Sequence, residues 1–424
     1  MGLFLSLVMA YAMWWNSESS ALAQAVKPLI EQGGGAVGYG EVLPAPVKPE
    51  DNAAPIYDRA SVIYSIAESS FLAWMRENSV EKGDAFPWMQ DEDWTPRQKD
   101  LIEKFMALGD AGDVAELLKE AATKPESLFE LEYAKGYELP MPHLARARNL
   151  TRFAAMKVRL ASIAGKPDEA VSWVGVGMAI SRSMEREPIV ISCLVKMACE
   201  KIMHAEVQNL VLKQNLSAAQ LKELEKALRP SGKTVSMADA MRLERAFAVE
   251  ICVKLNGRRI PELLSMINGG DYPWYGAVGP VARPLLMRAT ANYIGDATRM
   301  VEVMALPDPD GLKASRALMN ELNAKYQKDK AANFFGAAVM PALTKWREES
   351  MNARTRTETA RIAAAMKAHK LEKGKLPAEQ KTLVPDYLPA LPMDPFTGKE
   401  YAVKHERGML VVFSPNGGET RIKE

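Results

Sequence analysis

The residues best suited to metal chemistry lie four positions apart on one helical face. Glu200 and His204 stand at i and i+4 in a segment with helical periodicity, so their side chains should point the same way. An imidazole and a carboxylate can ligate zinc, but a tetrahedral site needs further ligands from a second helix, and the sequence has no H-E-x-x-H motif. We therefore expect no metal site, and we interpret His204 as a buried or hydrogen-bonded histidine.

Two aromatic clusters combine flat rings with polar groups, as carbohydrate-binding surfaces do. Residues 88–94 read WMQDEDW and residues 272–275 read YPWY. Paired carboxylates are the machinery of most glycoside hydrolases, so a cell-wall or glycan hydrolase using Asp91, Glu92 or Glu200 is the alternative function. The other interpretation is that these aromatic residues anchor loops at the end of a helical array. The candidate ligand surface comprises Trp88, Asp91, Glu92, Trp94, Trp274 and Tyr275.

Three short strings match catalytic or nucleotide motifs without the surroundings that those motifs need. Residues 33–38 have the G-x-G-x-x-G spacing, but no strand precedes them. Residues 232–234 (GKT) match the end of a phosphate loop, yet a helix precedes them. Residues 79–82 fit S-x-x-K without its companion motifs. We expect no cofactor, and the sequence identifies no catalytic residue.

The composition is that of a folded globular protein. The chain has 424 residues, of which 48% are hydrophobic and 25% charged, so it is long enough for two or three domains. Its 54 Lys and Arg against 53 Asp and Glu leave a net charge of +1. Nucleic-acid binding needs a concentrated basic surface, so we expect no nucleic-acid partner.

The first 23 residues have the pattern of a signal peptide. Residues 3–15 (LFLSLVMAYAMWW) form an apolar run that is shorter than the roughly 20 residues of a spanning helix. Ala21-Leu22-Ala23 is a small-x-small pattern at which a signal peptidase would cleave before Gln24. An uncleaved anchor and a cytosolic chain remain alternatives, because no Lys or Arg precedes Lys27. We expect an extracytoplasmic protein that contacts the membrane only through this segment, if it is uncleaved.

The three cysteines do not form a disulfide framework. An odd number cannot pair fully within one molecule. Cys193 and Cys199 are six residues apart on one predicted helix, a rise of about 9 Å that is too long for a disulfide. A bridge from Cys252 to one of them stays open, and the simpler interpretation is three small apolar core residues.

Beyond a linker, most of the chain has helical periodicity. Residues 24–55 hold five Pro and five Gly without apolar periodicity, which predicts a linker. Thr95, Pro96 and Gln98 predict a helix start with a capping box. The segments between short connections predict an irregular antiparallel helical array, and residues 268–284, rich in Gly, Pro and aromatics, predict a loop. We predict a signal peptide over 1–23, the linker over 24–55, a helical domain over 56–336, and a long helix with a small β region over 337–424.

The C-terminal region changes character after a long Ala-rich helix. Gly374 ends that helix, five prolines follow by residue 395, and residues 399–403 and 409–413 predict two strands. The block from Pro392 to Gly398 (PMDPFTG) predicts a structural clasp. In it Pro392 and Pro395 fix the backbone, Asp394 accepts from nearby N–H groups, Phe396 anchors the loop and Gly398 permits the turn.

This order of helix, G-x-x-P, proline-flanked loop, D-P-F-x-G block and strands ending in Ser414-Pro415-Asn416-Gly417-Gly418 resembles the globular region of type II secretion pseudopilins. The whole chain resembles uncharacterised helical envelope proteins of bacteria. Pseudopilins begin with an apolar helix that packs into a filament, whereas the related helix here is internal and carries Arg354, Arg356 and Arg361. The resemblance implies a mainly α protein with a pseudopilin-like α+β end.

The sequence therefore predicts an exported protein of the bacterial envelope that acts as a non-enzymatic scaffold or interaction protein. The resemblance also suggests a link to a secretion system. Its expected partners are other envelope proteins.

Overall fold

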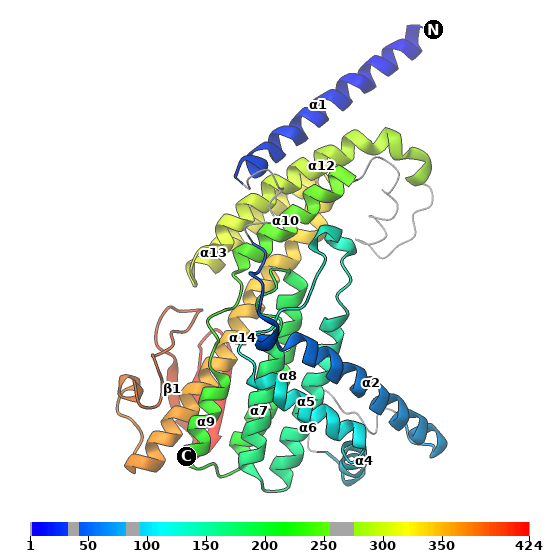
Figure 1. Ribbon diagram of the computed structural model, residues 1–424. Coiled ribbons are helices and arrows are strands. Elements are labelled where there is room, and N and C mark those ends of the chain that lie inside the picture. Colours follow the sequence, from blue (N-terminus) through cyan, green and yellow to red (C-terminus); the bar gives the residue numbers. More distant parts are fainter. Residues whose placement is uncertain (1, 33–41, 82–93, 255–274, 424) are drawn as a thin grey trace.

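Helices make up most of the chain, and a small antiparallel sheet lies near its C-terminus. The computed structural model describes residues 2–32, 42–81, 94–254 and 275–423. In Figure 1 one group of helices forms the lower body, a second group forms the upper body, and the 40-residue helix α14 (Phe334–Lys373) runs through both. The fold is mainly α with a small C-terminal α+β region, as the sequence predicts.

The lower group consists of helices that follow one another along the chain, several of them joined by short connections. They are α2 (Ala54–Glu77), α4 (Pro96–Met106), α5 (Gly109–Thr123), α6 (Pro142–Ile163), α7 (Pro167–Arg182), α8 (Val190–Lys213) and α9 (Ala218–Leu228). Their apolar faces share one core, in which the ring of Tyr64 meets Phe105 and Phe153 edge-on with centroids 6.0 and 6.2 Å apart. The structure also has three short 3-10 turns: η1 (Pro49–Asp51) before α2, η2 (Tyr133–Glu138) before α6, and η3 (Gln380–Leu383) after α14.

Local sequence sets where several of these helices begin. Thr95 accepts from the backbone N–H of Gln98, whose side chain accepts from the N–H of Thr95, so the predicted capping box is confirmed. Ser217 and Gln220 form the same box at the start of α9. Prolines open α4, α6 and α7, where a missing N–H costs no helical hydrogen bond.

The upper group packs around a second core. It contains α10 (Met237–Lys254), α12 (Tyr275–Met304) and α13 (Asp310–Lys328) together with the first half of α14. Tyr293, Met300 and Leu322 are fully buried there, and Trp346 brings α14 into the same cluster. This second core explains why α14 is continuous, because each of its halves is buried against a different helical group.

The prediction of a loop over residues 268–284 is wrong from Tyr275 onward. The helix α12 begins at Tyr275 and continues through Pro280 and Pro284. Proline and glycine disfavour helix locally, but α12 packs along α10 and α1 and this tertiary contact outweighs the local preference.

The N-terminal helix α1 (Gly2–Gln32) extends beyond the predicted signal peptide and into the segment expected to be a linker. It packs on α12, where buried Glu18 pairs with Arg288 and Leu22 and Ala25 contact Ile294. These contacts explain why the helix continues to Gln32. No helix in the described part of the chain combines the length and apolar character needed to cross a bilayer.

The C-terminal sheet packs directly on the lower body. Its strands β1 (Ala402–Glu406), β2 (Met409–Phe413) and β3 (Glu419–Lys423) pair antiparallel in the order β1-β2-β3. The predicted strand over residues 409–413 is confirmed, whereas the first strand begins at Ala402 because residues 399 and 400 pair with the clasp block instead. β3 lies against α14 and α8, and Leu410, Val412 and Ile422 belong to the lower core.

Candidate functional site

A charged cavity of about 350 Å³ lies where α7, α8, α9 and α14 meet. The loop over residues 229–236 forms one of its walls. Seven charged side chains line it from elements far apart in sequence: Arg182, Glu185, Lys196, Glu200, Arg229, Arg354 and Glu358. Pockets for small molecules have volumes of about 300–1,000 Å³, so the cavity is large enough for a small ligand.

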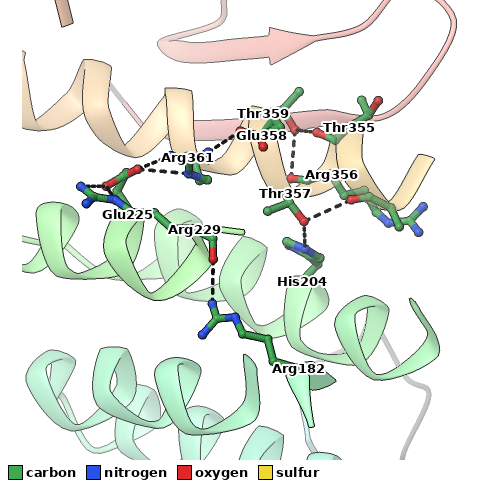
Figure 2. A network of polar contacts seen from close by, with 11 residues as sticks. Arg182, His204, Glu225, Arg229, Thr355, Arg356, Thr357, Glu358, Thr359 and Arg361 are labelled. Carbon is green, nitrogen blue, oxygen red and sulfur yellow. Dashed lines mark hydrogen bonds and ion pairs between the residues drawn. The ribbon is translucent and has the colours of Figure 1, made fainter. Parts of the chain in front are cut away.

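Arg182, the last residue of α7, holds the end of α9 in place. Its Nη2 donates to the backbone carbonyl oxygens of Ala227 and Arg229, the latter at 3.0 Å, as Figure 2 shows for Arg229. These carbonyls have no partner within their own helix, so a guanidinium satisfies them. Burial lowers the pKa of Arg182, against the opposing effect of Glu185.

A buried ion-pair network joins α9 to α14 beside the cavity. In Figure 2 the guanidinium of Arg361 lies between two carboxylates, with Nη2 2.7 Å from Oε1 of Glu225 and Nη1 2.7 Å from Oε2 of Glu358. Glu225 also accepts from Nη2 of Arg229 at 2.6 Å. Burial raises the pKa of Glu358 even though Arg361 opposes the shift. Removing one partner of such a network would leave an uncompensated buried charge, which costs about 3–5 kcal/mol.

Glu200 and His204 are both buried on α8, but each has a different partner. His204 Nε2 is 2.8 Å from Oγ1 of Thr357 on α14, and Glu200 Oε1 is 2.6 Å from Nζ of Lys196. Burial lowers the pKa of His204 to about 4, so it is neutral at pH 7. Among the described residues no cluster of three or more His, Cys, Asp or Glu side chains is placed to hold a metal ion. His204 is thus a buried, hydrogen-bonded histidine, the interpretation that its sequence context favours.

Little of the predicted aromatic ligand surface lies within the described residues. Trp94 is half-buried and stacks under the guanidinium of Arg159, 5.1 Å from its ring centroid. Trp88, Asp91, Glu92 and Trp274 lie outside the described residues. Tyr275 is the first residue of α12, and its side chain also lies outside the description. Cys193 and Cys199 are free thiols on α8, and burial raises the pKa of Cys199 to about 11.

In the clasp block, Asp394 is 1% exposed and acts as an acceptor for three groups. Its Oδ1 accepts from the N–H of Phe396 at 3.0 Å, and its Oδ2 accepts from the hydroxyls of Thr397 and Ser414, both at 2.9 Å. Gly398 has φ +68°, the left-handed conformation that favours glycine. Phe396 packs on Gly417, where a Cβ would lie 2.9 Å from the ring. This block joins the loop before β1 to the turn after β2.

A second concave surface, of about 630 Å³, lies between α2 and α5. We call it the α2–α5 groove. Its lining comprises Arg59, Ile63, Asp113, Glu116, Leu117, Lys119, Glu120 and Thr123. On the same face of α2, Val62 and Ile66 are 54% and 53% exposed. The groove thus has an acidic wall on α5, and exposed apolar side chains of α2 lie beside it.

Comparisons with protein-family models, with curated proteins and with solved structures find no match to this chain. The pseudopilin resemblance therefore stays a prediction from the sequence.

Sequence reasoning missed a buried polar cluster that looks like a catalytic triad. His143 Nε2 forms a hydrogen bond with Oε2 of Glu187 at 3.1 Å, and the hydroxyl of Ser192 donates to the same oxygen. In a hydrolytic triad the serine donates to the histidine, which then removes its proton. Here the serine and the histidine both contact Glu187, so this arrangement holds residues 187–192 in place and does not activate the serine.

Proposed function

We propose that this protein is an exported component of the bacterial cell envelope and acts as a non-enzymatic interaction scaffold. The α2–α5 groove carries this proposal, because it presents Val62 and Ile66 to solvent beside a concave surface. Exposed apolar side chains grouped at a concave surface are typical of protein-interaction sites.

The occupant that fits the α2–α5 groove is an amphipathic helix with Lys or Arg along its polar edge, contributed by another envelope protein. On α5, Glu116 is paired with Lys119, while Asp113 and Glu120 form no ion pair among the described residues. Arg59 is the one lining cation there without an ion pair in the described part of the chain. The unpaired groups therefore sum to a net negative charge. Complementary charge of this kind selects a basic partner and speeds its association.

Binding of designed peptides tests the groove directly. The probe is an 18-residue amphipathic helix of Leu and Lys, measured by fluorescence anisotropy against the same helix with Glu in place of Lys. We expect the Lys peptide to bind more tightly and to weaken with salt. Ile66→Lys should weaken binding of the Lys peptide about tenfold. The substitution removes apolar area that the bound peptide would cover, and it adds a positive charge that repels the Lys side chains of the peptide.

The control for Ile66→Lys is Ile163→Lys, since Ile163 is 49% exposed on α6. Three results would refute the groove as the docking surface: an equal loss of peptide affinity in the two variants, equal binding of the Lys and Glu peptides, or no binding of the Lys peptide.

The envelope location is supported by the apolar run over residues 3–15 and by the pseudopilin-like tail. Cleavage after Ala23 would remove Glu18 and Leu22 from their contacts with α12 and leave Ala25 in place. Fractionation of a C-terminally tagged chain with N-terminal sequencing tests the location. A chain beginning at Gln24 in an extracytoplasmic fraction supports export, and an intact chain in the cytosol overturns it.

A glycan hydrolase is the second candidate, and one observation favours it. Three carboxyl groups, those of Glu185, Glu200 and Glu358, line the charged cavity together. A glycosidase needs a pair of carboxyl groups at its substrate site, one of which acts as the general acid. The test is release of reducing sugar from purified peptidoglycan, which Glu358→Gln should abolish and Glu349→Gln should not. No release by the unaltered protein would remove this candidate.

A further inference from the structure

Two oppositely charged groups in the charged cavity have no ion-pair partner among the described residues. One is Arg354, an exposed residue of α14 on the cavity lining. The other is Glu185, 8% exposed, whose Oε2 accepts only from the hydroxyls of Ser231 and Thr234, at 2.6 and 3.5 Å. The remaining charged lining groups are engaged by carboxylates, cations or backbone carbonyls, as described above.

Each of these groups can recognise one half of a zwitterion. The guanidinium of Arg354 offers a planar set of donors that fits a carboxylate. Oε1 of Glu185 accepts no hydrogen bond among the described residues, so it can take an ammonium group. Met178, Met197 and Leu228 also line the cavity and supply apolar surface, and methionine adapts to different shapes.

We propose that the charged cavity binds a small zwitterion with an apolar side chain, of the α-amino acid or dipeptide class. Its carboxylate would lie on Arg354 and its ammonium group on Glu185. This inference is independent of the α2–α5 groove and goes beyond the proposed scaffold function.

The two unpaired groups argue against other ligand classes. The carboxylate of Glu185, which has no ion-pair partner among the described residues, would repel a dianion such as phosphate. A neutral disaccharide, the ligand class of the glycan hydrolase candidate, would leave Arg354 and Glu185 without opposite charges after removing water from both, which is unfavourable. A zwitterion satisfies both groups at once. The glycan and zwitterion assignments of this cavity are therefore alternatives, and the titration below distinguishes them.

Calorimetric titration of the full-length protein tests the proposal by comparing ligands that have both charged groups with ligands that lack one of them. The probes are leucine, methionine and the dipeptide Ala-Leu, with leucinamide lacking the carboxylate and 4-methylpentanoate lacking the ammonium group. We expect at least one zwitterion to bind, and its amide and desamino forms to bind about tenfold more weakly, the effect of losing a hydrogen bond to a charged group. The proposal is overturned if no zwitterion binds at about 10 mM. It is also overturned if the amide binds equally well, or if phosphate or diacetylchitobiose binds instead.

The variant Arg354→Gln then tests whether Arg354 binds the carboxylate of the ligand. Because Arg354 is exposed, this variant should fold normally, and it should weaken leucine binding about tenfold while leaving leucinamide binding unchanged. Arg76→Gln is the control, since Arg76 is exposed on α2 and remote from the cavity lining. Equal binding of leucine to Arg354→Gln and to the unaltered protein would refute the assignment.

Discussion

The start of α13 lies so close to the buried guanidinium of Arg347 that Gly311 has no room for a side chain. A Cβ on Gly311 would lie 1.8 Å from Nη2 of Arg347 and 2.6 Å from the carbonyl oxygen of Leu306. Arg347 is 1% exposed and is held by Asp308, with Nε···Oδ1 2.9 Å, and by the carbonyl oxygens of Val303 and Leu306. This guanidinium therefore ties the end of α12 to α14.

Gly311→Ala should destabilise the protein, although alanine is the better helix former. In an open helix position the change from Gly to Ala stabilises by about 0.5–1 kcal/mol. Here the new carbon must displace the guanidinium of Arg347 from Asp308, and breaking a buried ion pair costs about 3–5 kcal/mol. We expect the free energy of unfolding to fall by about 3 kcal/mol, opposite in sign to the helix propensity.

Urea unfolding followed by circular dichroism measures this change. The control is Gly295→Ala in α12, where no atom lies within 4 Å of the added Cβ, so stability should be equal or slightly higher. Arg347→Lys should also cost less in the Gly311→Ala background than alone, because the two changes break the same contacts. If Gly311→Ala proves as stable as Gly295→Ala, the proposed role of Arg347 is wrong.

Three further predictions concern buried groups. Burial lowers the pKa of His204 from 6.5 to about 4, so the contribution of His204 to stability falls as the pH drops through this range. Burial raises the pKa of Glu244 from 4.5 to about 7, so the contribution of Glu244 rises as the pH drops from 7 to 4.5 and offsets that of His204. Glu244→Gln removes this offset, so the free energy of unfolding of the variant should fall by about 3 kcal/mol between pH 7 and 4, measured as urea midpoints. Asp394→Ala should cost about 2–4 kcal/mol by loss of three hydrogen bonds, and Asp394→Asn less, since the hydroxyl of Ser414 can accept as well as donate; thermal unfolding compares them. Gly177→Ala should lower the melting temperature, because its Cβ would lie 2.3 Å from Sδ of the fully buried Met203, and a stability equal to the unaltered protein would contradict this contact.

Local signals in the sequence were enough for much of the fold. Thr95 with Gln98 marked a helix start, Gly374 marked the end of the long helix, and residues 409–413 marked a strand. Each of these features depends on neighbours within a few residues. β3 lacks such a signal, because its sequence ETRIK is mostly polar. The strand is held in place by pairing with β2 and by a hydrogen bond from Gln208 of α8.

The charged cavity could not be predicted in the same way. Arg182 and Arg354 line one cavity although they lie far apart in the sequence, and neither belongs to a motif. An arginine on a predicted helix is ordinarily assigned to the surface, yet Arg347 and Arg361 are buried. Their burial depends on acidic partners in distant segments, which periodicity along one helix does not reveal.

The position of α14 also determines how the function of the tail can be tested. Ile362, Ala363 and Ala364 are fully buried in the lower core, and Arg361 neutralises the buried carboxylate of Glu225. Removing the tail together with α14 would open this core and leave Glu225 paired with Arg229 alone, so loss of function in such a truncation would report unfolding. The C-terminal sheet is part of the same core as the helical body. The proposed function of this region must therefore be tested through exposed side chains of the sheet and its turns, in variants whose unfolding transition is unchanged.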